Sequence, residues 1–134
     1  MDTHLLEVRT GRRPSVEDLT PGVMAFCRSR GDGLLSVFAP HSTCGVALIE
    51  RGAGSVQDLL AALESILPRG FGWRHRHGSP GHGADHVMPV IVSPSLVLPV
   101  LDGQPALGVW QSVVLVDPNR DNSVRKVRLS FIPA

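Results

Sequence analysis

The sequence lacks the features that mark membrane, secreted and nucleic-acid-binding proteins. No apolar run approaches the ~20 residues that a membrane-spanning helix needs, and the N-terminus lacks the basic region and apolar stretch of a signal peptide. The net charge is only +1 with neutral histidines, so the chain carries no strong electrostatic footprint for nucleic acid or a membrane surface. We therefore expect a cytoplasmic protein whose partners include neither nucleic acid nor membrane.

Cysteine is also scarce. Cys27 and Cys44 lie in separate apolar segments without CxxC spacing, so the ligand pattern of a structural zinc finger is missing. They predict small buried side chains, because free cysteine is among the most buried residue types. A reactive or metal-bound thiol stays open as an alternative for Cys44, which lies three residues after His41. The length of 134 residues suffices to bury a core without disulfides, and we expect one domain over residues 1–134.

Apolar periodicity predicts an α+β fold. One helix is expected after Thr20-Pro21, where proline suits the first helical position, with Gly31 as its end. A second helix is expected to begin at Ser55. The predicted strands cover residues 4–10, 34–38, 44–49, 95–101, 106–116 and 124–131. Because strands and helices do not alternate regularly, we expect a compact domain with a mainly antiparallel sheet and two or three helices, not βαβ units.

The segment Ser55–Leu67 gives the clearest local signal. Ser55 is the expected N-cap, with Asp58 three residues later in an arrangement like a capping box. Pro68 ends the predicted helix. The apolar residues form one stripe at helical spacing, which predicts a face that packs on the core. These residues are Val56, Leu59, Leu60, Leu63, Ile66 and Leu67.

Three finer expectations concern the strands. Residues 44–49 are apolar on both faces, which favours a central, buried strand. Asp102-Gly103 between apolar runs predicts a hairpin, and the following Gln104-Pro105 suggests a loop longer than two residues. Trp110 lies within the predicted strand 106–116 and is expected to be a core aromatic residue.

Histidine forms the most distinctive pattern. Four of the six histidines, His75, His77, His82 and His86, lie within twelve residues of a Gly/Pro-rich segment, and His41 ends a predicted strand. Imidazole is the commonest metal ligand. Open three-histidine sites, with water or substrate in the fourth position, match this pattern better than closed structural zinc sites. The alternative is a solvated histidine-rich loop, and spacing alone does not assign the four.

Other polar residues offer further chemistry. Ser42 and Thr43 can donate hydroxyl hydrogen bonds to a phosphate or satisfy backbone groups in a turn. Arg125 can bind phosphate oxygens or belong to the solvated face of the last strand. Asp85 can orient a histidine, bind metal directly or cap a helix near His86. The chain contains no Gly-x-Ser-x-Gly elbow, so a serine hydrolase is not expected.

Ordered blocks across nearly the whole chain resemble the YjbQ-like family. They are His41-x-Thr43, Glu50, Asp58, Trp73-Arg74-His75, Asp85-His86, Leu98-Pro99-Val100, Gly103, Leu107-Gly108-x-Trp110-Gln111 and Arg125-Lys126. The resemblance implies a compact α+β domain that forms a homotrimer with clefts near the subunit boundaries. It also implies the activity described for members of the family, that of a secondary thiamine-phosphate synthase.

A specific site follows from this resemblance. The metal ligands are expected at His41, His75 and His86, with zinc or magnesium as the divalent cofactor. Catalytic residues are expected at His41, Thr43, Glu50, Asp58, Asp85 and Gln111, and Ser42 and Arg125 are expected to hold a small phosphorylated substrate. The implied reaction joins an activated pyrimidine diphosphate to a thiazole phosphate. A non-catalytic protein that binds a metal or a phosphorylated ligand, and a metal-dependent hydrolase, are the alternatives.

The chain departs from the family pattern at three positions. Ile49 replaces the usual asparagine, Pro94 falls where a Gly-Thr/Ser turn is usual, and Val109 replaces a threonine. If the asparagine and threonine contact substrate in relatives, the ligand of this chain differs from theirs. His77 and His82 lie outside the shared pattern. We therefore expect a His41→Ala change to abolish tight metal binding and a His77→Ala change to leave it almost unaltered.

Overall fold

The computed structural model describes residues 1–134 and divides them into eight strands, three α-helices and one short 3-10 helix. In chain order the elements are β1 (Asp2–Arg9), β2 (Ser15–Asp18), α1 (Thr20–Cys27), β3 (Gly33–Phe38), β4 (Gly45–Ile49), α2 (Ser55–Ile66), the 3-10 helix η1 (Arg69–Phe71), α3 (Gly83–Ile91), β5 (Ser95–Leu101), β6 (Gln104–Pro105), β7 (Ser112–Asp117) and β8 (Val124–Pro133).

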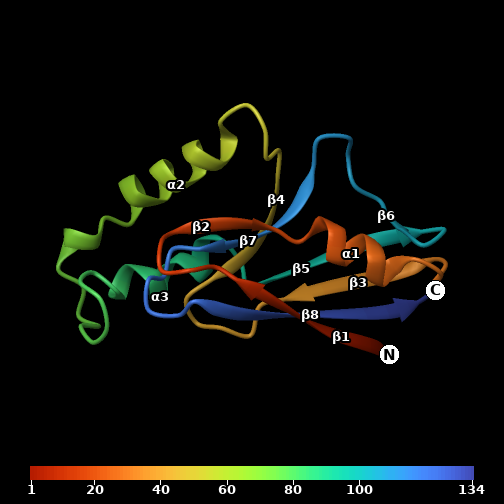
Figure 1. Cartoon of the computed structure of the whole chain (residues 1–134), viewed down its shortest axis with the longest axis horizontal. Coiled ribbons are helices and arrows are strands. Elements are labelled where there is room, and N and C mark those ends of the chain that lie inside the picture. The colour runs from red at the N-terminus through yellow and green to blue at the C-terminus, as the bar shows by residue number, and fades with distance from the viewer.

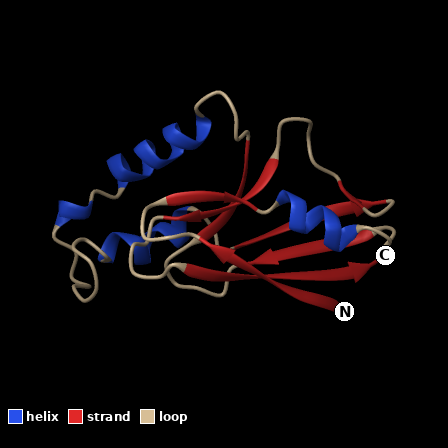
Figure 2. Ribbon diagram, in the orientation of Figure 1, coloured by secondary structure: helices blue, strands red, loops and turns tan.

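The strands form two sheets in which every pairing is antiparallel (Figures 1 and 2). The larger sheet has the order β1-β8-β3-β5-β6, and the smaller sheet has the order β2-β7-β4. The prediction of a mainly antiparallel α+β domain with two or three helices is therefore confirmed. None of the helices has the length and apolar character that a membrane-spanning helix requires.

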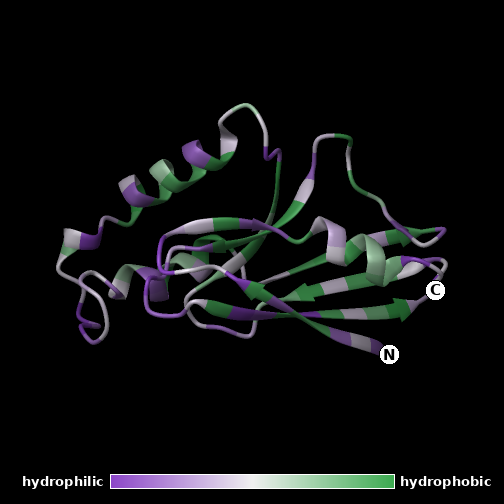
Figure 3. Ribbon diagram, in the orientation of Figure 1, coloured by the Kyte–Doolittle hydropathy of each residue, from purple (hydrophilic) through white to green (hydrophobic).

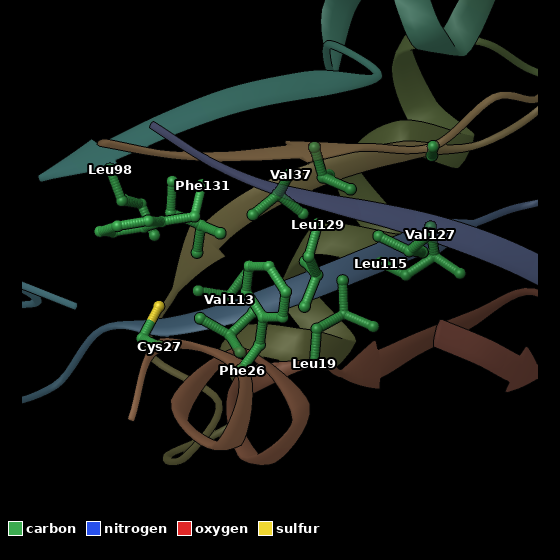
Figure 4. Packing of buried hydrophobic residues seen from close by; sticks show 14 of the residues in the cluster. Leu19, Phe26, Cys27, Val37, Leu98, Val113, Leu115, Val127, Leu129 and Phe131 are labelled. Atoms are coloured by element: carbon green, nitrogen blue, oxygen red, sulfur yellow. The ribbon is translucent and has the colours of Figure 1, made fainter. Parts of the chain in front are cut away.

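The main core lies between the two sheets and beside α1 (Figure 4). Val37 of β3 and Leu129 of β8 are fully buried in it, together with Val113 and Leu115 of β7. Phe26 of α1 belongs to the same cluster. Because side chains alternate across a strand, each of these strands presents every second residue to this core.

The strand β7 is buried on both faces, since its intervening residues belong to a second core. That second core joins β7 to α2 and α3 and consists of Leu63, Leu67, Ala84, Met88, Val114 and Val116. Packing on β7 holds α3 beside the loop that follows this strand, as Figure 1 shows. The histidines at the start of α3 are thereby brought close to residues after Asp117.

The strand β4 lies at an edge of the smaller sheet, so the predicted central position is wrong. Its second neighbour is the chain after α3: the Val46 N–H donates to the Ser93 carbonyl at 2.8 Å. Gly45 lies against the same segment, because a Cβ there would come within 2.0 Å of the Val92 carbonyl oxygen. The apolar faces of β4 are thus covered by this segment and by both cores, without a further strand.

The predicted strand 106–116 begins later than expected. Residues 106–111 form a loop in which the Gln111 N–H donates to the Gly108 carbonyl, and β7 starts at Ser112. Trp110 lies in this loop with 74% of its surface exposed, so it is not a core residue.

The hairpin before this loop is tighter than predicted. Leu101 pairs with Gln104, which leaves Asp102 and Gly103 as a two-residue turn. Both have positive φ angles, 50° and 72°, as a type I′ turn requires.

The helix α2 is confirmed, but its start and its apolar stripe differ from expectation. Gly54, with a φ of 87°, occupies the N-cap position, and no side chain caps the helix. Leu63 is buried, whereas Ile66 is 60% exposed, so only part of the stripe packs on the core. Figure 3 shows the mixture of apolar and polar residues along this helix. The first helix also ends early, at Cys27, well before Gly31.

Candidate functional site

A polar cavity of about 470 Å³ opens where four separate segments meet. The segments are the turn between β3 and β4, the loop before α3, the first turn of α3, and the stretch from the β7–β8 loop into β8. No hydrophobic residue lines the cavity. The lining residues are Pro40, His41, Ser42, Thr43, His77, Gly78, His82, His86, Asp121, Asn122 and Arg125.

Three imidazoles form a tight group beside this cavity, of which His82 and His86 line it and His75 lines a neighbouring one. One ring nitrogen from each of His75, His82 and His86 lies within 4.8 Å of the other two. The Nε2 atoms of His82 and His86 are 2.9 Å apart. Desolvation and the neighbouring imidazoles lower the pKa of the exposed His75 and of the partly buried His86, which keeps both rings neutral at physiological pH. Neutral rings with converging nitrogens are suited to bind a metal ion.

His82 is the buried member of the group, and its Nδ1 faces a carboxylate oxygen and an amide nitrogen. Its Nδ1 lies 2.7 Å from Oδ2 of Asp121. The amide nitrogen of Asn119 is 3.1 Å from the same Nδ1 and 2.9 Å from Oδ2 of Asp85. The loop between β7 and β8 therefore determines how the His82 ring is held.

Asp85 is buried beside this network and is already fully paired. Its Oδ1 accepts from Arg69 at 2.8 Å and its Oδ2 accepts from Asn119. Burial raises the pKa of Asp85, while the hydrogen bonds from Asn119 and Arg69 act in the opposite direction. A second group of potential ligands, His82, Asp85 and Asp121, overlaps the three imidazoles. The Arg69 cation on Asp85 disfavours a metal there, so these carboxylates support the imidazoles instead.

Arg125 lies on β8 and is almost completely buried at the edge of the cavity. Its Nε and Nη2 donate to the two carboxylate oxygens of Asp117, at 2.7 and 3.1 Å, and Nη2 also donates to Oγ1 of Thr43 at 2.8 Å. Asp117 raises the pKa of Arg125 against the opposing effect of burial. The remaining nitrogen, Nη1, has no hydrogen-bond partner within the chain and can donate to an anion.

His41 lines the same cavity but lies outside the tight group of three imidazoles. Its Nε2 is bound to the backbone of Lys126, 3.0 Å from the N–H and 3.1 Å from the carbonyl oxygen. Burial and the Arg125 charge lower the pKa of His41. The neutral ring therefore has its Nδ1 left for a ligand. Of the three predicted ligands, His41 and His86 line this cavity and His75 lines a neighbouring one, and His41 lies outside the tight group.

The predicted site residues divide between the cavity and distant surfaces. Ser42, Thr43 and Arg125 line the cavity, and Asp85 supports it from behind. Glu50 and Asp58 are exposed, at the end of β4 and on α2, and neither lines the cavity. Gln111 is also exposed, and its Oε1 accepts from the Gly108 N–H. Within one chain these three residues are not part of the assembled site.

Sequence reasoning did not select His82, Asn119 and Asp121. The i, i+4 spacing of His82 and His86 was a usable signal, since it places two side chains on one helical face. Asn119 and Asp121 carried no comparable signal, because their segment is typical of an ordinary polar turn.

The fold and cavity define a small α+β protein with a histidine-rich polar site. The chain belongs to the YjbQ-like family, since the family model described as "UPF0047 protein YjbQ-like" matches residues 4–134. A UPF0047 protein of Mycobacterium tuberculosis is 58% identical over 132 residues, which cover 98% of each chain. A UPF0047 protein of Archaeoglobus fulgidus is 32% identical over 112 residues, 84% of this chain and 87% of that relative.

Solved structures support the same assignment. A hypothetical protein from Aeropyrum pernix K1 superposes with a TM-score of 0.89 at 30% identity, and all of each chain is covered. A YbjQ-like protein of unknown function from Sulfolobus solfataricus reaches a TM-score of 0.92 at 21% identity, covering 99% of this chain and 97% of that one. At this lower identity the likeness shows the fold alone.

Proposed function

We propose that the chain is a metal-assisted enzyme that acts on a small phosphorylated substrate in the polar cavity. Its reaction is proposed to be of the thiamine-phosphate-synthase type, joining an activated pyrimidine diphosphate to a thiazole phosphate. The observation that carries the proposal is a group of three converging imidazoles, two of which share a cavity with a buried guanidinium, and no hydrophobic residue lines that cavity. Such a cavity favours a compact anion that also binds metal.

The residues present fit a zinc-type ion better than magnesium. Neutral imidazoles suit zinc and other late transition metals, whereas magnesium prefers oxygen ligands and water. His75, His82 and His86 would hold the ion, which would supply Lewis-acid stabilisation of the charge that develops on phosphate oxygens. Of the two metals considered from the sequence, we therefore propose zinc.

Arg125 and the turn after His41 are proposed to bind the phosphate oxygens. The Asp117 carboxylate holds the guanidinium in a fixed orientation, which leaves Nη1 as a pre-positioned donor. Ser42 is exposed at the cavity rim and offers a hydroxyl donor beside it. A leaving pyrophosphate would be held by these donors while the imidazole side of the cavity binds the metal.

One feature favours the alternative classes of function. The cavity of a single chain offers no hydrophobic side chain to pack against a pyrimidine or thiazole ring. A compact phosphorylated ligand that is only bound, or that is hydrolysed, needs no such contact. A non-catalytic binding protein and a metal-dependent hydrolase are therefore the second candidates.

One experiment separates these classes. Zinc-loaded protein is incubated with the pyrimidine diphosphate, with and without the thiazole phosphate, and thiamine phosphate, phosphate and pyrophosphate are measured. We expect thiamine phosphate to form, and we expect its formation to stop after chelation and in a His86→Ala variant. Release of phosphate without the thiazole partner would identify a hydrolase instead. Tight binding without any product would identify a binding protein.

We also propose that the chain assembles as a homotrimer. The outer face of the larger sheet carries Leu34, Val97, Leu101 and Ile132, all about half exposed or more. Strand register makes this face continuous, since Leu34 pairs with Ile132 on one side and with Pro99 on the other. An apolar patch of this kind marks an interaction surface. In such a trimer, exposed residues such as Trp110 would lie close to the surface of the neighbouring copy.

Light scattering tests the assembly. We expect a mass of three times the 14.4 kDa of the chain. A Val97→Asp variant should shift the mass toward the monomer, because a charge in a buried apolar interface is costly. An Ile66→Asp variant makes the same kind of change on α2, outside this patch, and should leave the mass unchanged. A wild-type mass of 14.4 kDa would contradict the proposal.

A further inference from the structure

We propose that Asp121 is a positioning residue that fixes the tautomer of His82, so that the Nε2 lone pair of His82 faces the other two imidazoles. The inference concerns the metal group of the proposed function and deepens it. No sequence signal marks Asp121, which lies in a polar turn between β7 and β8. Its role follows from what its carboxylate contacts.

The contact geometry selects one tautomer of His82. Oδ2 of Asp121 lies 2.7 Å from Nδ1 of His82, and a carboxylate can only accept a hydrogen bond. Nδ1 must therefore carry a proton, and in a ring with a single proton Nε2 is left with its lone pair. The Nε2 of His86, 2.9 Å away, then donates to Nε2 of His82. The nitrogen that faces the imidazole group is thus the one able to bind metal.

The Asp121 carboxylate is itself held in place from two sides. The Ser79 N–H donates to Oδ1 at 3.1 Å, and the Ser79 hydroxyl donates to Oδ2 at 3.1 Å. The buried Asn119 accepts the backbone N–H of Asp121 through its Oδ1 at 3.0 Å. Ser79 belongs to the histidine-rich loop and Asn119 to the β7–β8 loop. Asp121 therefore ties these loops together while it orients the ring.

Asn119 completes the arrangement by supporting the neighbouring carboxylate. It is fully buried, and its amide nitrogen donates to Oδ2 of Asp85 at 2.9 Å. Its contact with Nδ1 of His82 is longer, at 3.1 Å, than the 2.7 Å contact from Asp121. The amide nitrogen can only donate, so a hydrogen bond to it would need a lone pair on Nδ1, which the shorter contact with the Asp121 carboxylate excludes. The amide hydrogens of Asn119 have the carboxylate oxygens of Asp85 and Asp121 as acceptors instead, at 2.9 and 3.4 Å. Carboxylate–histidine pairs of this kind orient metal ligands and raise their basicity.

An Asp121→Asn variant tests the inference without relying on metal. The Ser79 N–H should keep the amide oxygen at the Oδ1 position, which turns the amide NH₂ toward Nδ1 of His82. His82 should then switch to the Nε2–H tautomer, as happens when the aspartate of a catalytic triad is replaced by asparagine. The readout is the pair of imidazole ¹⁵N chemical shifts of His82, measured at neutral pH in metal-free protein. An Asp102→Asn variant, with the same chemical change in the β5–β6 turn, should keep the wild-type tautomer.

Zinc affinity gives the second readout. The Asp121→Asn variant should bind zinc about 10–100-fold more weakly, the usual effect of losing a partner that orients a ligand. A merely structural role would lower the melting temperature of the metal-free protein without changing the tautomer. Wild-type His82 in the Nε2–H form, or an unchanged tautomer in the variant, would overturn the inference. If wild-type protein bound no zinc, the proposed function would fail, and the ¹⁵N shifts would still decide the role of Asp121.

Discussion

A His82→Ala change is expected to lower the zinc affinity at least about 100-fold, because losing a direct ligand costs more than losing a partner that orients one. His82 contributes one of the three nitrogens that lie within 4.8 Å of each other. Its ring is also the most firmly held, through Asp121 and the buried loop around Asn119. Competition with a chromophoric chelator measures the loss.

His77 provides the matched control, since it lines the cavity from the same loop but is not in the tight group. A His77→Ala change should alter the affinity by less than about threefold, well below the 10–100-fold effect of losing a partner that orients a ligand. His41 separates the two ligand sets. If His41→Ala lowered the zinc affinity more than His82→Ala did, the ligands would be His41, His75 and His86, as predicted from the sequence. Equal losses of affinity in all variants would indicate chelation by a flexible loop.

The pH dependence of zinc binding should follow the lowered pKa of His75 and His86. Protons compete with the metal for imidazole nitrogens, so affinity is lost as the pH falls. A lowered pKa keeps the rings neutral to more acidic pH, and the loss should therefore begin below about pH 6.5, the ordinary histidine value. Competition with the chromophoric chelator, repeated over a range of pH, measures where the loss begins. A solvated loop of histidines with ordinary pKa values would lose its zinc already near pH 6.5.

An Arg125→Met change is expected to destabilise the protein by about 3–5 kcal/mol, the usual cost of removing one partner from a buried ion pair. The Asp117 carboxylate is completely buried and would lose both bonds from the guanidinium. Oγ1 of Thr43 would lose its donor as well. Urea unfolding of the metal-free protein measures the change in the free energy of unfolding.

The neighbouring Lys126 supplies the control, since its side chain is exposed and only its backbone contacts His41. A Lys126→Met change should alter the stability by less than about 0.5 kcal/mol. The double variant Asp117→Asn, Arg125→Met should recover part of the loss, because it removes the unpaired buried charge. A loss below about 1 kcal/mol in Arg125→Met would mean that the pair is not buried in solution, because breaking a buried pair costs several times more.

Local patterns in the sequence were enough for much of the fold. The apolar stripe of Ser55–Leu67 predicted α2 to within a residue, and alternation predicted the strand ending the chain. These patterns succeed because helix and strand periodicity depend on residues that are near each other in the chain. The family resemblance rested on ordered local blocks for the same reason, and it identified the family correctly.

The position of a strand in its sheet and the exposure of a side chain depended on tertiary contacts that local patterns do not contain. β4 is an edge strand because the segment after α3, not another strand, lies along its free side. Trp110 is exposed because it lies in the turn between Gly108 and Gln111, and β7 begins only at Ser112.

The site shows the same limit most clearly. His82 and Asn119 meet across 37 positions, and His41 and Lys126 across 85. Helix and strand periodicity does not predict contacts between residues so far apart in the chain. The sequence by itself indicated that a polar site rich in histidine would form, through its clustered histidines. Only the packing of α3 on β7 decided which imidazoles converge, because it places the start of that helix against the loop that carries Asn119 and Asp121.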